Sequence, residues 1–265
     1  MFEYSYDHSL ITIIVVLVGL IFGSFVTAAS YRIPLRKGFV FGRSKCPSCK
    51  TPLSALDLIP VFSWLASGGK CRHCGKAVGW KYPAIEMSTA IVFLIIYQKF
   101  GLSYEALIIA IFSVCLMIMV VIDFEHYIIP DGLNLTMFCL AATYMLLGDA
   151  RLQQFIAGPL LGLGIGLGLR WLIFLWKRRE GLGMGDVKFM AVAGLFLTPE
   201  LIITFLFLSG VIGIIISVLW KILGKGEEFP FGPALAASLF ICILAPEFHD
   251  LWSNAIGSLA INIIK

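Results

Sequence analysis

The sequence predicts an all-α membrane protein, a polytopic bundle of about eight transmembrane helices with one small cytoplasmic loop domain. Of its 265 residues, 59% are hydrophobic and only 14% are charged, which is more apolar surface than a soluble protein of this size can hide. Apolar runs of roughly 20 residues recur, and this length crosses about 30 Å of hydrocarbon. We expect these runs to be helical, because a spanning segment must satisfy its backbone hydrogen bonds internally.

Eight segments have the composition of a membrane span. They are residues 10–30, 83–100, 104–122, 133–147, 155–176, 187–197, 201–223 and 231–248. The fourth and sixth segments are short, which leaves a count of seven or nine open. Glu3 and Asp7, without any Lys or Arg, precede the first span, so we expect a retained span with its N-terminus outside, not a cleaved signal peptide. We expect the mildly apolar tail 249–265 at the membrane interface.

Basic residues set the expected orientation of the chain. Residues 31–82 carry ten of the twenty Lys and Arg side chains, so the positive-inside rule places this segment in the cytoplasm. Alternating the spans then brings the ends that carry Asp123 and Asp186 to the cytoplasmic face. The expected domains are a first transmembrane helix (1–30), a cytoplasmic domain (31–82) and a membrane-embedded domain (83–265). Topology and contact with anionic lipid explain the basic charge, so we expect no nucleic-acid partner.

Two C-x-x-C pairs lie in the cytoplasmic segment. Cys46 and Cys49 form the first pair, and Cys71 and Cys74 form the second, with 21 residues between the pairs. Four thiolates close a tetrahedral zinc site, so this pattern predicts one structural zinc ion. A pair of redox-active dithiols is the alternative. The apolar residues 58–65 between the pairs either pack under the metal or lie on the membrane surface, with Trp64 at the headgroup level.

Two aspartates at apolar boundaries are the candidate catalytic groups. Asp123 follows the apolar run 118–122, and Asp186 closes Gly183-Met184-Gly185. An ionisable residue at such a boundary indicates function, and two carboxylates that share a proton are the equipment of an aspartic protease. The glycines permit close backbone approach and unusual dihedrals around an extended substrate. Asp186 is alternatively a helix N-cap, and Asp131 is expected to be an ordinary acid near a helix N-terminus.

These motifs resemble those of the type IV prepilin peptidases, also called prepilin leader peptidase/N-methyltransferases, which are intramembrane aspartic proteases of the Gly-x-Gly-Asp type. The similar segments are residues 19–25, 31–34, 43–49, 59–65, 71–75, 82–86, 122–131, 181–188 and 230–236. The resemblance implies that Asp123 and Asp186 are the catalytic pair. Pro233-Ala234-Leu235 also resembles the Pro-Ala-Leu segment of other intramembrane aspartic proteases, which implies that Pro233 supports the active site.

The resemblance implies an activity. Members of this family cut the short basic leader from type IV prepilins and pseudopilins at the cytoplasmic face of the bacterial inner membrane, usually between Gly and Phe. They often then methylate the new N-terminus with S-adenosylmethionine, in support of type IV pilus or type II secretion assembly. The sequence indicates no site for the methyl donor and no oligomeric state. The glycines at 162, 164, 166 and 168 lie inside a span, where we expect them to serve helix packing.

Two other functions remain open on the sequence. A proton-coupled transporter also carries acids inside the membrane, although usually near the midplane and with inverted repeats. A non-enzymatic, zinc-bearing scaffold for pilus or secretion assembly would explain the cysteines and leave the aspartates without a role.

Overall fold

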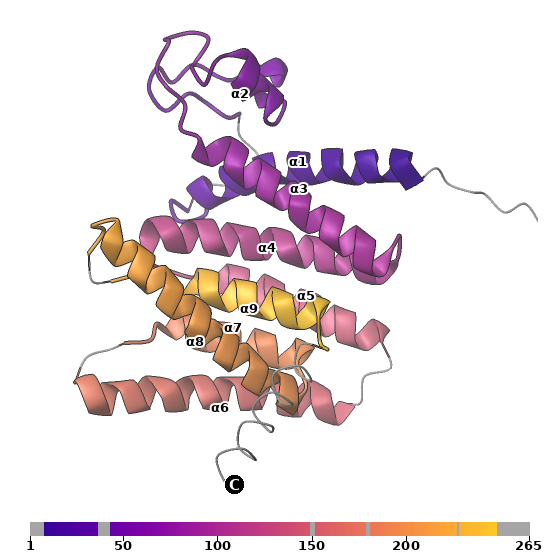
Figure 1. The fold of residues 1–265 in the computed structure, drawn as a ribbon, viewed down its shortest axis with the longest axis vertical. Helices are drawn as coiled ribbons and strands as arrows, with labels where there is room; N and C mark the ends of the chain where they lie inside the picture. Colours follow the sequence, from indigo (N-terminus) through magenta and orange to yellow (C-terminus); the bar gives the residue numbers. More distant parts are fainter. Residues whose placement is uncertain (1–7, 37–42, 149–151, 179–180, 227, 248–265) are drawn as a thin grey trace, which may run out of the picture. The chain divides into compact units, whose positions relative to one another are not determined.

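The computed structural model describes residues 8–36, 43–148, 152–178, 181–226 and 228–247 (Figure 1). The elements are α1 (His8–Arg32), η1 (Ala55–Leu58), α2 (Phe62–Ala66), α3 (Lys81–Phe100), α4 (Tyr104–His126), α5 (Asp131–Leu147), α6 (Leu152–Lys177), α7 (Met184–Phe196), α8 (Pro199–Ile222) and α9 (Gly232–Leu244). Within these ranges the only β-pairing is two isolated bridges, so the all-α prediction is confirmed. The expectations for the first seven residues and for the tail 249–265 fall outside the described residues.

Five helices are long and apolar enough to cross a membrane, which confirms the membrane class. They are α1, α3, α4, α8 and the Phe155–Trp176 part of α6. Helices α5 and α9 are apolar but shorter, and α7 has only 13 residues. At 1.5 Å per residue, α7 is about 20 Å long, less than the roughly 30 Å of a hydrocarbon core. Each of the eight predicted spans coincides with a helix, but length and composition do not confirm a count of eight.

The chain divides into two compact units, Met1–Ile122 and Asp123–Lys265, with the boundary inside α4. The predicted domain limits at residues 30 and 82 stay a prediction. Helix α4 runs to His126, one turn beyond the apolar run. Glu125 and His126 therefore lie in the last turn of this helix and not in the loop that follows it.

In the first unit, α1 and α3 pack through small residues. A Cβ atom at Gly19 would lie 2.6 Å from the Ala90 Cα atom, and one at Gly23 would lie 2.5 Å from the Glu86 Cα atom. The absence of side chains at these two positions allows the helices to approach closely. Phe22 stacks on Phe93 beside this contact, with 5.5 Å between the ring centroids.

A buried carboxylate connects the cysteine-bearing segment to α3. Glu86, 8% exposed, accepts a 2.7 Å hydrogen bond from the Val61 backbone N–H. Val61 has φ 59° and ψ −52°, a conformation with positive φ that β-branched residues rarely adopt. The Glu86 bond therefore holds the start of α2 in a backbone conformation that the local sequence does not favour.

In the second unit, α7 packs against α5, α6, α8 and α9. The contact with α6 is backbone to backbone. Cβ atoms at Gly158 and Gly162 of α6 would overlap the backbone of Gly194 and Met190 in α7. The predicted packing role is confirmed for Gly162 and for Gly166, which faces Val187 and Met190, while Gly164 and Gly168 face open space. This packing fixes the short helix that begins beside Asp186.

Candidate active site and metal centre

Asp123 lies in the last turn of α4 and is only 5% exposed. A negative charge at a helix C-terminus is unfavourable, so this carboxylate needs compensation from elsewhere. The Gly232 N–H, at the N-terminus of α9, donates a 2.8 Å hydrogen bond to Asp123 Oδ2. The positive N-terminal end of α9 therefore stabilises the Asp123 carboxylate at the C-terminal end of α4, 109 residues away in sequence.

Asp186 lies in the first turn of α7, outside the five candidate spans. The Gly183 N–H donates a 3.1 Å hydrogen bond to Asp186 Oδ2, which closes the start of the helix. The capping alternative for Asp186 is therefore partly correct, because the side chain satisfies a backbone donor. One carboxylate oxygen has this role, and Oδ1 has no such bond to Gly183.

The two carboxylates interact electrostatically. Burial and, second, the negative charge of Asp123 together raise the pKa of Asp186 to about 7, against the lowering effect of the Gly183 N–H. Two acids that feel each other's charge do not both ionise readily near neutral pH. This arrangement can hold one proton between two carboxyl groups, which is the state required for acid–base cleavage of an amide.

Gly183 and Gly185 allow close approach but do not adopt unusual dihedrals. Gly183 has φ −64° and ψ 148°, and Gly185 is helical, so the expectation of unusual dihedrals is wrong. A Cβ atom at Gly185 would lie 2.8 Å from the Ile129 Cβ atom, and one at Gly183 would lie 3.0 Å from Asp186 Oδ2. Glycine is needed here because the space is occupied.

Pro233 stands in the first turn of α9, directly after Gly232. Proline suits the first turn of a helix because it lacks an N–H that would be unsatisfied there. Pro233 thus helps to set where α9 begins. The direct contact to Asp123 comes from Gly232, where a Cβ atom would lie 2.8 Å from Asp123 Oδ2. Sequence analysis did not single out Gly232, although a Gly-Pro pair that opens a helix is a recognisable signal.

Helices α5 and α7 are joined beside Asp186 by two polar contacts. Lys188 Nζ lies 2.6 Å from Asp131 Oδ1, and both side chains are exposed. Asn134 Nδ2 donates a 3.1 Å hydrogen bond to the Gly185 carbonyl. Asp131 does begin a helix, as expected, and it also has this ion partner. Sequence analysis identified neither Asn134 nor Lys188.

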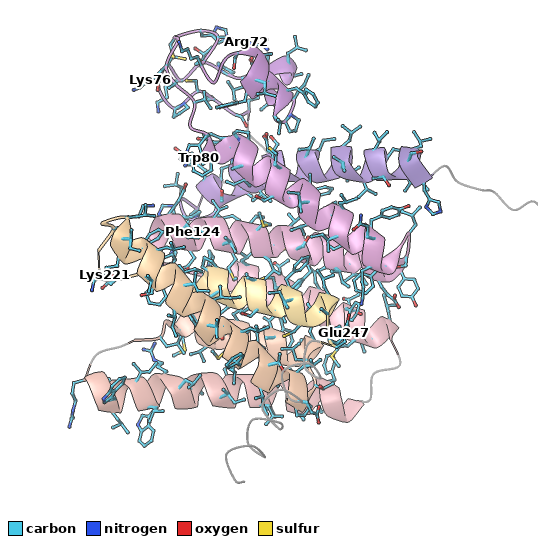
Figure 2. All side chains as sticks on the ribbon, in the orientation of Figure 1. Arg72, Lys76, Trp80, Phe124, Lys221 and Glu247 are labelled. Atoms are coloured by element: carbon cyan, nitrogen blue, oxygen red, sulfur yellow. The ribbon has the colours of Figure 1, made fainter. Side chains whose placement is uncertain are left out.

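Aromatic side chains fix the end of α4 after Asp123. Phe124 stacks on Trp220 of α8 with 5.8 Å between centroids, and Tyr127 meets the same ring edge-on at 6.4 Å. Lys225 Nζ lies 4.3 Å from the Trp220 ring centroid, a cation–π contact. Figure 2 labels Phe124 near the end of α4 and Lys221 near the end of α8.

The four cysteines of the predicted metal site come together in the first unit. One ligand atom from each of Cys46, Cys49, Cys71 and Cys74 lies within 4.8 Å of the others, a spacing that can hold a metal ion. All four are free thiols. Hydrogen bonds from the backbone of Cys49 and Ser48 lower the pKa of the Cys46 thiol, and those from Cys74 and His73 lower that of Cys71. Such donors stabilise thiolates, which are the form that binds a metal.

The two cysteine pairs have the same backbone turn. The Cys46 N–H bonds the Thr51 carbonyl and the Lys50 N–H bonds the Cys46 carbonyl. In the second pair, the Cys71 N–H bonds the Lys76 carbonyl and the Gly75 N–H bonds the Cys71 carbonyl. These repeated turns aim both pairs of sulfur atoms at one point, as expected of two metal knuckles.

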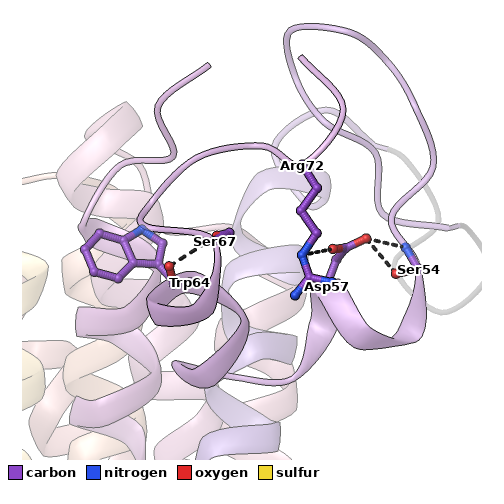
Figure 3. Close-up of polar contacts among 5 residues, drawn as sticks. All are labelled: Ser54, Asp57, Trp64, Ser67 and Arg72. Carbon is purple, nitrogen blue, oxygen red and sulfur yellow. Dashed lines mark hydrogen bonds and ion pairs between the residues drawn. The ribbon is translucent and has the colours of Figure 1, made fainter. Parts of the chain in front are cut away.

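Polar contacts around η1 and α2 brace this segment (Figure 3). Asp57 accepts hydrogen bonds from the Ser54 N–H at 3.0 Å and hydroxyl at 2.6 Å, and lies 3.3 Å from Arg72 Nε in the second cysteine pair. Trp64 Nε1 donates a 3.0 Å bond to the Val78 carbonyl, and the ring covers Gly69. Trp64 therefore contacts its own segment, whereas Leu58, Ile59, Phe62 and Leu65 of the same apolar run are exposed, so both alternatives for residues 58–65 stay predictions.

Two family models match the chain. The model described as the Bacterial Peptidase A24 N-terminal domain matches residues 17–100. The model described as the Type IV leader peptidase family matches residues 110–218, a range that contains both Asp123 and Asp186. The four cysteines fall within the first match and the carboxylate pair within the second.

Relatives with assigned names are similar over most of their length. A prepilin leader peptidase/N-methyltransferase of Bacillus subtilis (strain 168) is 34% identical over 229 residues, 85% of this chain and 91% of the relative. One of Pseudomonas aeruginosa is 28% identical over 270 residues, 91% and 93% of the two chains. A type 4 prepilin-like proteins leader peptide-processing enzyme of Escherichia coli is 30% identical over 239 residues, 82% and 88% of the two.

No solved structure matches the chain at a significant level. The two family models together extend over most of the sequence, and the Bacillus subtilis relative is matched along nearly its whole length. The chain therefore belongs to the type IV leader peptidase family.

Proposed function

We propose that this chain is a prepilin peptidase, which removes the short basic leader from type IV prepilins and related pseudopilins. The observation that carries this proposal is the carboxylate pair. Asp123 and Asp186 come from different helices of the second unit, and the charge of one acts on the pKa of the other. The names of the relatives give the substrate class, and the family resemblance gives the Gly-Phe bond as the usual point of cleavage.

In the proposed reaction, the two acids share one proton. The ionised acid takes a proton from a water molecule, whose oxygen attacks the scissile carbonyl carbon. The protonated acid donates its proton to the carbonyl oxygen. The C–N bond then breaks as the first acid passes the proton taken from water to the leaving amine nitrogen. The second acid regains its proton from a hydroxyl group of the tetrahedral intermediate, which becomes the new carboxyl group. We assign the protonated role to Asp186, whose pKa of about 7 favours that form, and the base role to Asp123.

The same chain is proposed to methylate the amine that cleavage releases. S-adenosylmethionine would be the methyl donor, as the names of the relatives and the family resemblance imply. Nothing in the described geometry assigns a residue to the methyl donor.

We further propose that the four cysteines hold a structural zinc ion. Zinc binds four thiolates in a closed tetrahedron, which leaves no position for a substrate. The ion would fix the fold of the cysteine-bearing segment and take no part in the cleavage. The ten basic residues of the segment 31–82 support an inner-membrane protein whose active site faces the cytoplasm.

The decisive experiment is cleavage of a prepilin peptide by the protein purified in detergent, with mass spectrometry to locate the cut and any added methyl group. Asp123→Asn and Asp186→Asn should each abolish cleavage. Asp131→Asn is the matched control, because its exposed ion pair contributes little. A parent protein that leaves the peptide intact would favour a scaffold or a transporter.

A further inference from the structure

Asn134 is a buried amide in the second turn of α5, surrounded by an otherwise apolar helix surface. It is 4% exposed, and its backbone N–H donates a hydrogen bond to the Pro130 carbonyl at the start of the helix. Its side-chain Nδ2 donates to the carbonyl of Gly185, the residue directly before Asp186, at 3.1 Å. Its Oδ1 atom is buried without a hydrogen-bond partner among the described residues.

Packing alone does not explain an asparagine at this position. A buried acceptor without a partner is destabilising, and a leucine of similar shape would avoid that cost. Rotating the amide by half a turn would not help, because Oδ1 would then face the Gly185 carbonyl oxygen, which is also an acceptor. The contact that accounts for the amide is therefore its donor bond to Gly185.

That bond acts on the peptide group that leads into Asp186. The Gly185 carbonyl belongs to the peptide plane whose nitrogen is the Asp186 backbone nitrogen, so fixing this plane fixes the direction of the Asp186 side chain. The Gly-x-Gly-Asp loop is also held at its other end, where Arg170 donates to the Leu182 carbonyl at 2.6 Å. Asn134 and Arg170 thus hold the loop from α5 and α6, which both pack against α7.

We propose that Asn134 is a positioning residue of the peptidase, which orients Asp186 through the Gly185 carbonyl. This inference rests on the proposed function, since it assigns to Asp186 a role in cleavage. Asn134 itself need not touch the substrate. Its removal should slow the chemical step and leave substrate binding largely intact, because Asn134 is buried and offers the prepilin almost no exposed surface.

The test compares two variants that lose the side-chain N–H donor, Asn134→Leu, which keeps the shape of the side chain, and Asn134→Ala, in detergent with a prepilin peptide. Misplacement of a catalytic group by about 1 Å lowers the rate by up to a hundredfold, so kcat should fall about ten- to a hundredfold. KM should stay near the parental value. A role in folding alone would lower the amount of active enzyme without this separation of kcat from KM.

Met137→Ala is the matched control, since Met137 is fully buried one turn further along α5 and has no bond to the loop. It should lower the unfolding temperature and leave kcat per folded molecule unchanged. If Asn134→Leu does not fold, Asn134→Ala decides the question. Parental kcat in either folded variant would overturn the inference. Asp186→Asn, run alongside, separates the two proposals: cleavage by that variant would overturn the proposed function itself.

Discussion

Replacing Gly232 by alanine is the sharpest test of how Asp123 is held. The new Cβ atom would lie 2.8 Å from Asp123 Oδ2 and 3.1 Å from its Cγ atom, closer than such contacts normally occur. Either the carboxylate or the start of α9 must move, and the 2.8 Å hydrogen bond from the Gly232 N–H is lost or lengthened. A hydrogen bond to a charged group contributes about 1.5–3 kcal/mol.

At about 1.4 kcal/mol per factor of ten in rate, loss of this bond should lower kcat roughly ten- to a hundredfold. The assay is prepilin peptide cleavage in detergent, with the unfolding temperature measured on the same sample. Gly210→Ala in α8 is the control, because a Cβ atom there meets nothing within 4 Å. Parental kcat in a folded Gly232→Ala protein would show that the bond does not position Asp123.

Three further predictions concern the two sites. The double variant Asp123→Asn with Asp186→Asn should cleave hardly more slowly than either single variant, because the pair acts as one unit; multiplied losses would contradict this. Because burial first and then the charge of Asp123 raise the pKa of Asp186 to about 7, its proton is lost as the pH rises through that value, so kcat should fall on the alkaline side. A kcat that is constant across that range would count against Asp186 as the acid. Cys46→Ser should lower the bound zinc from about one ion per chain and loosen the cysteine-bearing segment, as measured by metal analysis and proteolysis, and zinc-free parent protein would refute the site.

The sequence predicts those features that depend on local pattern. Apolar runs identify the helices because a membrane span needs a fixed length, and the spacing of Cys46, Cys49, Cys71 and Cys74 identifies the knuckles because each ligand pair is local. The predicted span ends with the apolar run at residue 122, whereas α4 continues to His126, because the polar residues that follow still extend the helix.

Contacts between distant segments could not be read in the same way. The Gly232 N–H reaches Asp123 across 109 residues, and Asn134 reaches Gly185 across 51. Each depends on which helices become neighbours, a property that no local pattern encodes. The dihedral prediction for Gly183 was wrong for a related reason, since its glycine is required by the space beside the Asp186 carboxylate and not by its own backbone angles.

The enclosure of α7 has a consequence for membranes of different thickness. From Phe189 to Phe196 no residue of α7 is exposed, and four other helices pack around it. A thicker or thinner bilayer acts on lipid-facing helices through tilt and local deformation. Because α7 from Phe189 onward is enclosed by protein, the depth of the Asp186 carboxylate at its start is set by the neighbouring helices. Its level should therefore change little between lipids of different chain length.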